Sequence, residues 1–64
     1  MRIDRIKFTV LLTTKDLTLS NLATMSGVSR TTLSSIKQGK RCSVETAKKI
    51  AKALNVDVTE ILED

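Results

Sequence analysis

The sequence predicts an all-α fold, and three observations lead to that prediction. Apolar residues recur at helical spacing along most of the 64 residues, polar capping residues precede these runs, and proline is absent. Glycine occurs only at Gly27 and Gly39, so we expect short connections between regular elements and no linkers. Residues 1–64 are therefore expected to form a single compact domain of five short helices without strands.

The first two helices are predicted at about residues 4–14 and 19–26. Asp4 and Thr18 are suitable N-caps, because their side-chain oxygens can accept from the free amides of a first turn. Gly27 can end the second helix in the left-handed conformation. We expect these helices to place four apolar residues in the core: Phe8, Leu22, Ala23 and Met25.

The third and fourth helices are predicted at about residues 30–37 and 44–55. Ser29 and Ser43 are their expected N-caps, and Gly39 ends the third helix. Leu33 and Ile36 lie three residues apart on one face of the third helix. In the fourth helix, Ala47, Ile50, Ala51 and Leu54 follow the i, i+3, i+4, i+7 pattern, which exposes Lys48, Lys49 and Lys52.

A fifth helix is predicted at about residues 58–63. The string "DVTE" at residues 57–60 is a capping box for its first turn, with Asp57 at the N-cap and Glu60 at position N3. From this helix, we expect three apolar residues to seal the core, with a dimer contact as the alternative: Val58, Ile61 and Leu62.

Composition excludes several classes of protein. Eleven basic residues against seven acidic ones give a net charge of +4, which suits an anionic partner such as nucleic acid or a membrane surface. With no histidine and a single cysteine, Cys42, neither a zinc finger nor an internal disulfide is expected. The apolar run 10–12 is too short for a signal peptide or a membrane span, so we expect a soluble cytoplasmic protein. Because clustered carboxylates and a glycine-rich phosphate loop are also absent, we expect no enzyme, cofactor or small-molecule ligand.

The third predicted helix lies in a segment without negative charge. No carboxylate occurs between Asp16 and Glu45, whereas four cations do: Arg30, Lys37, Lys40 and Arg41. Small hydroxylated residues at 31–35 would let a helix approach the floor of the DNA major groove, where an arginine can bind guanine through two hydrogen bonds. Free amides at 18–20 and 29–31 can meet phosphates. This pattern predicts a helix that reads DNA.

The string "LATMSGVSRTTLSSIKQGK", followed by "SVETAKKIAKALNV", resembles the lambda-repressor-like helix-turn-helix family, which includes the phage CI and Cro proteins and many small bacterial regulators. The resemblance runs from about Phe8 to Leu62. It implies a compact five-helix DNA-binding domain with helices two and three as the helix-turn-helix. The residues expected to read bases are Arg30, Thr31, Ser34, Ser35 and Arg41, and those expected to hold phosphates are Thr18, Ser29, Lys37, Gln38 and Lys40.

The sequence departs from the family pattern in two ways. Leu19 stands where the family commonly has a glutamine that touches a phosphate, so that contact is not expected here. Leu12 and Lys37 replace an arginine and a glutamate that pair in many members. Because both partners are absent together, no charge is left buried alone, and Lys37 is free to face solvent or DNA.

Less specific interpretations exist for each feature. The hydroxylated run 29–35 is also what a cap followed by a solvated face would look like, and we expect Lys48, Lys49 and Lys52 to form a solvated face. Arg41 beside Cys42 suggests a lowered thiol pKa and a redox role, which we consider a minor alternative.

The sequence thus predicts a sequence-specific regulator of transcription that binds a double-stranded DNA operator as a homodimer. We expect a phage or mobile-element repressor or Cro-like protein. An antitoxin-type DNA-binding protein whose main partner is another protein is the alternative. RNA or single-strand binding is disfavoured, because such modules stack bases on aromatic rings and this chain has only Phe8.

Overall fold

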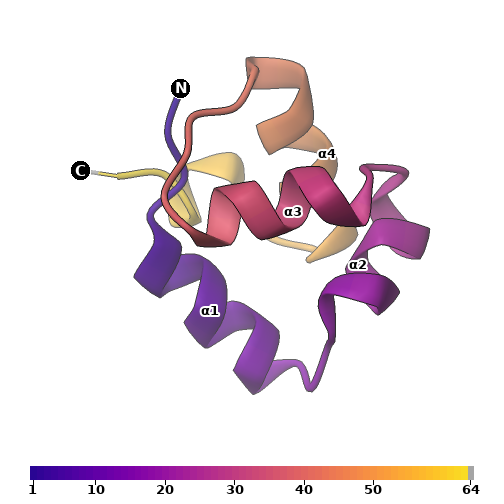
Figure 1. The fold of residues 1–64 in the computed structure, drawn as a ribbon. Helices are drawn as coiled ribbons and strands as arrows, with labels where there is room; N and C mark the ends of the chain where they lie inside the picture. The colour runs from indigo at the N-terminus through magenta and orange to yellow at the C-terminus, as the bar shows by residue number, and fades with distance from the viewer. Residues whose placement is uncertain (64) are drawn as a thin grey trace.

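The computed structural model describes residues 1–63, which form four α-helices and one short 3-10 helix (Figure 1). The α-helices are α1 (Arg5–Thr14), α2 (Leu19–Ser26), α3 (Arg30–Lys37) and α4 (Val44–Ala53), and the 3-10 helix is η1 (Val58–Glu60). In the described residues, the only β-type pairing is an isolated antiparallel bridge between Ile3 and Leu62. The all-helical prediction is confirmed.

The ends of the helices lie where capping chemistry predicts them. Asp4, Thr18, Ser29 and Ser43 each accept a backbone N–H of the following first turn and are the N-caps of α1 to α4. Gly27 follows α2 in the left-handed conformation, with φ 74°, and its N–H donates to the carbonyl of Ala23. These short caps make the connection between α2 and α3 only three residues long.

The prediction of five α-helices is not confirmed, because the expected helix at 58–63 is a single 3-10 turn. The capping box of Asp57 and Glu60 is present, but the chain leaves the turn at Ile61. The Ile61 carbonyl accepts the N–H of Asp4 at 2.8 Å, and Leu62 pairs with Ile3. Bonding to the N-terminal segment therefore replaces the bonds that would continue a helix. Similarly, α4 stops at Ala53, with Leu54 as its C-cap, although it was expected to extend to residue 55.

One core packs between all the helices, and both ends of the described chain close over it. Phe8, Leu22, Leu33, Ile50 and Ile61 are completely buried, as predicted for each of their helices. The remaining residues of the buried core are Ile3, Leu12, Val28, Ile36, Ala47, Ala51 and Leu54.

The expectation that Met25 fills the core is wrong, since this side chain is 52% exposed. Ser26, four residues after the buried Leu22, takes the half-buried position at that end of α2, and its hydroxyl donates to the Leu22 carbonyl at 2.7 Å. Met25 instead borders a surface hollow with Lys49 and Ala53 of α4.

Candidate nucleic-acid interface

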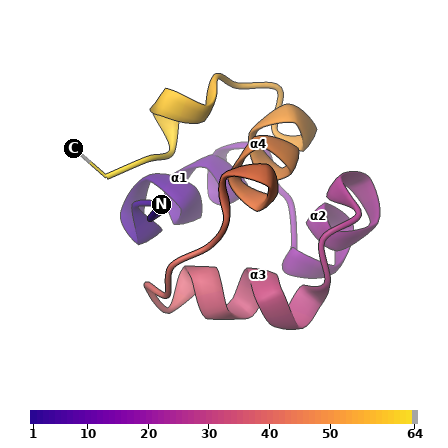
Figure 2. The ribbon, with the colours of Figure 1, turned by 90° about the horizontal axis from the view of Figure 1, so that it is seen from above.

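Helix α3 lies along one side of the molecule, with α4 and η1 toward the other (Figure 2). Leu33 is 0% and Ile36 1% exposed, which fixes the inward face of the helix. The opposite face is hollowed, with a volume of ≈ 350 Å³. The residues that line this hollow are Arg30, Thr31, Ser34, Ser35 and Gln38.

Four of the five predicted base-reading residues therefore share one surface, and Gln38, predicted to hold phosphate, lies with them. Ser34 and Ser35 are half-buried, whereas Arg30 and Gln38 are exposed near the two ends of the helix. The surface is low in its middle and carries a long hydrogen-bonding side chain at each end. Arginine suits guanine and glutamine suits adenine, each through two hydrogen bonds in the major groove.

Arg41 does not line this hollow; it follows α3 in the connection to α4 and is exposed. Lys37 and Lys40 are also exposed near the end of α3. In the part of the chain that the structure describes, no carboxylate lies within ion-pair distance of these three cations or of Arg30. Their charge remains available to an anionic partner.

The hydroxyls of two predicted phosphate ligands are already engaged in capping. Ser29 Oγ accepts the N–H of Thr32 at 3.2 Å and donates to Thr32 Oγ1 at 2.8 Å. Thr18 Oγ1 accepts the N–H of Asn21 at 3.1 Å and donates to Asn21 Oδ1 at 2.9 Å. What these caps offer an anion is the pair of amides just after each of them, which have no acceptor within their helix.

Arg2 holds the turn after α3, a role that the sequence does not indicate. Gly39 has φ 96°, and its carbonyl accepts from Arg2 Nε at 3.0 Å. The Met1 carbonyl accepts the N–H of Cys42 at 3.1 Å, so the N-terminal segment fixes both sides of Lys40 and Arg41. No local sequence signal could reveal this role, because Arg2 and Gly39 are 37 positions apart.

Cys42 does not have the environment of a reactive thiol. It is half-buried, and burial raises the pKa of the Cys42 thiol from its ordinary value. The minor alternative of a lowered thiol pKa is therefore wrong, since removal from water outweighs the opposing charge of the N-terminal ammonium.

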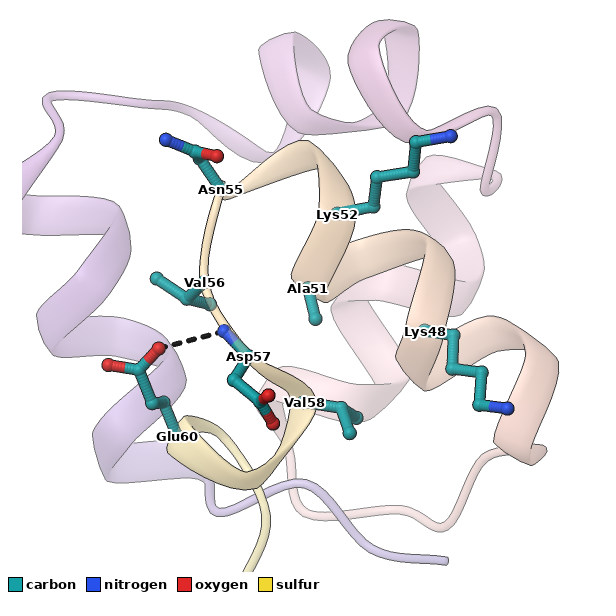
Figure 3. A pocket seen from close by; sticks show the side chains of 8 residues that line it. All are labelled: Lys48, Ala51, Lys52, Asn55, Val56, Asp57, Val58 and Glu60. Carbon is teal, nitrogen blue, oxygen red and sulfur yellow. Dashed lines mark hydrogen bonds between the residues drawn. The ribbon is translucent and has the colours of Figure 1, made fainter.

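A larger hollow of ≈ 530 Å³ lies between α4 and η1 (Figure 3). Lys48 and Lys52 border it, but so do Asp57 and Glu60, and the Glu60 carboxylate accepts the N–H of Asp57 at 2.8 Å. Its mixed charge does not suit a phosphate backbone. The smaller hollow on α3 is the better candidate, since only cationic and uncharged side chains line it.

Comparison with known proteins identifies the class. A family model described as the Cro/C1-type helix-turn-helix DNA-binding domain matches residues 7–64, and the chain belongs to this family. The predicted resemblance is confirmed, and with it a helix-turn-helix DNA-binding domain. Residues 1–63 contain no helix with the length and apolar character needed to cross a membrane.

Two solved structures share the fold. They are native PhpD with cadmium atoms and PhpD with cadmium complexed with hydroethylphosphonate. Each superimposes with a TM-score of 0.85 and is 23% identical, covering 100% of this chain and 14% of that chain. The chain thus spans about one seventh of the length of these proteins, and the likeness concerns the fold alone. No curated protein matches the chain.

Proposed function

We propose that this chain is a sequence-specific regulator of transcription that recognises double-stranded DNA through the outer face of α3. The observation that carries the proposal is the gathering of Arg30, Thr31, Ser34 and Ser35 with Gln38 around one hollow, opposite the buried Leu33 and Ile36. Family membership supports DNA binding, and this face supports the reading of bases. A phage or mobile-element repressor or Cro-like protein that acts in the cytoplasm is the form of regulator we propose.

Each group on this side has a distinct role in the proposed complex. Arg30 and Gln38 bind base edges at the two ends of α3, and the serines allow the helix to approach the groove floor. Arg41 reaches a further base, while Lys37 and Lys40 hold the phosphate backbone. Amides following Thr18 and Ser29 bind phosphates at the start of α2 and α3.

A homodimer is part of the proposal, because an eight-residue recognition helix contacts only a few base pairs. Two copies with two-fold symmetry would place their α3 helices in successive major grooves, roughly 34 Å apart. The operator would then be a palindrome with half-sites about one helical turn apart.

Selection of bound sequences from a random pool of duplexes tests this function. We expect enrichment of a short motif, repeated with dyad symmetry at a spacing of about 10 base pairs. The Arg30→Ala variant should recover a motif that is degenerate at one position of each half-site, and the Lys49→Ala variant should recover the wild-type motif. If the wild-type chain binds the pool without enriching any motif, the proposed reading of bases is wrong.

A further inference from the structure

The outer face of α1 carries no charged residue along its centre. Ile6, Thr9, Val10 and Thr13 follow one another at i, i+3, i+4 and i+7, and all four are exposed. Ile6 is 66% and Val10 56% exposed, the two highest values among the large hydrophobic side chains of the described residues. Because Phe8 already buries the opposite face of α1, folding of this chain leaves these four residues, here called the α1 seam, without an apolar neighbour to cover them.

The α1 seam has the properties of a helix-packing surface. Its side chains are all β-branched and therefore stiff, so little rotamer freedom is lost on contact. The hydroxyl of Thr9 donates to the Arg5 carbonyl at 2.8 Å. An apolar partner lying over Thr9 would therefore leave this hydroxyl satisfied, without the cost of an unpaired polar group.

A groove of ≈ 230 Å³ joins the α1 seam to the end of α3. Arg5, Ile6, Thr9 and Val10 line it from α1, and Lys37 lines it from α3. The apolar centre is thus bordered by two cations, and α1 itself contains no acidic residue. Charges that flank an apolar surface determine which helices can bind to it. The two cations attract a helix with carboxylates beside its apolar residues and repel a helix with cations there.

This charge argues against a second copy of the chain as the occupant. A two-fold contact with its axis through this groove would bring the Arg5 and Lys37 of one copy toward the same cations of the other. We propose instead that the α1 seam binds an amphipathic helix of a partner protein whose apolar residues are flanked by glutamate or aspartate.

Binding of such a helix would be coupled to DNA binding through Lys37. Lys37 borders the groove, and the proposed function assigns the same side chain to the phosphate backbone. An acidic partner helix and a DNA duplex would then compete for one ammonium group, so the partner would weaken operator binding. The contact is only about two turns long, roughly 11 Å, and belongs to the small, transient class of interfaces. Its affinity should be on the order of micromolar.

Two synthetic helical peptides test the proposal without DNA. Both carry an isoleucine and leucine seam, flanked in one by glutamates and in the other by lysines. We expect the glutamate peptide to bind at micromolar concentration, measured by fluorescence anisotropy, and the lysine peptide to bind at least about tenfold more weakly. Ile6→Gln and Val10→Gln should each weaken the glutamate peptide by about tenfold, whereas Val44→Gln, at another exposed valine, should not.

Since the substituted side chains are exposed, all three variants should keep the wild-type circular dichroism spectrum and affinity for the selected duplex. Lys37→Gln should weaken the binding of both the glutamate peptide and DNA. Equal binding of the two peptides, or unchanged binding by Ile6→Gln, would overturn the proposal. So would sedimentation showing a wild-type dimer that Ile6→Gln converts to a monomer, because the occupant would then be a second copy. Failure of the proposed DNA reading alone would leave the peptide results unchanged.

Discussion

Helices α3 and α4 are both capped by a serine, both direct an isoleucine into the core, and both expose at least two cations. They differ in what lies beside those cations. On α3, Arg30 stands with Thr31, Ser34, Ser35 and Gln38 around one hollow without a carboxylate. On α4, Glu45 lies in the first turn, and Lys48 and Lys52 line the same hollow as Asp57 and Glu60 (Figure 3). Cations alone thus do not define the proposed DNA-reading face; the small hydrogen-bonding residues beside Arg30 distinguish it from α4.

Truncation in the core should affect the two helices equally, and this is the largest effect we expect. Leu33→Ala and Ile50→Ala each remove a fully buried side chain and should each lower the free energy of unfolding by about 2–5 kcal/mol. Urea denaturation followed by circular dichroism measures this loss. Ile50→Val is the milder control, at about 0.5–1.5 kcal/mol. A loss of less than about 2 kcal/mol for Leu33→Ala would show that Leu33 does not anchor α3 in the core.

Substitutions on the outer faces of α3 and α4 should affect DNA binding unequally. Arg30→Ala should cost about 1–3 kcal/mol of binding free energy on the selected duplex, because two hydrogen bonds to a base are lost, and should hardly change affinity for random duplex. Lys49→Ala should change neither. Fluorescence anisotropy titrations with both duplexes provide the four values. Equal losses for Arg30→Ala on the two duplexes would reassign Arg30 to the phosphate backbone.

Backbone-binding cations should have a smaller and sequence-independent effect. Lys40→Ala should weaken the selected and random duplexes alike and reduce the slope of log affinity against log salt by about one, since one phosphate contact is lost. Lys52→Ala, at the hollow of mixed charge, should leave that slope unchanged. A change in the slope for Lys52→Ala would extend the DNA surface to α4 and weaken the contrast between the helices.

The smallest difference that we expect between the helices is in how their caps make stability depend on pH. Serine caps of α3 and α4 do not titrate, whereas Asp4 and Asp57 cap α1 and η1. Amides of Lys7 and Ile6 hold the pKa of Asp4 below the ordinary 3.8, and those bonds are lost on unfolding. The amide and hydroxyl of Thr59 lower the pKa of Asp57 likewise.

A lowered folded-state pKa contributes stability that is present above 3.8 and lost as the pH falls through the folded value. Thermal unfolding between about pH 2 and 6 should therefore show a decline that begins below the ordinary carboxyl pKa. Replacing both residues by asparagine, which also caps helices, should reduce the decline. An unchanged decline in the double variant would place its origin in other carboxylates.

Local chemistry explains which parts of the fold were predictable. Caps at Asp4, Thr18, Ser29 and Ser43 act on amides two or three residues away, so the sequence contains the whole signal. The fate of residues 61–63 depends on bonds to residues 2–4, and no pattern within the C-terminal segment records them. For the same reason, a fifth α-helix was expected where a single turn exists.

The candidate site shows the same division. Helical spacing leaves Arg30, Thr31, Ser34, Ser35 and Gln38 outside the buried side of Leu33 and Ile36, and the structure gathers all five around one hollow. Helical spacing could not show that Arg2 holds the Gly39 turn. That role depends on a contact between positions 37 apart in the sequence.

Backbone amide chemical shifts, recorded while the selected duplex is added to isotope-labelled protein, test whether the outer face of α3 reads DNA. We expect the largest shifts at residues 29–41, with a second group at 18–20, where the proposed complex places α2 against the phosphate backbone. Amides of α4 and η1 should move little. If the largest shifts instead fall on Lys48, Lys49 and Lys52, with Arg30 and Ser34 unaffected, the outer face of α3 does not read DNA.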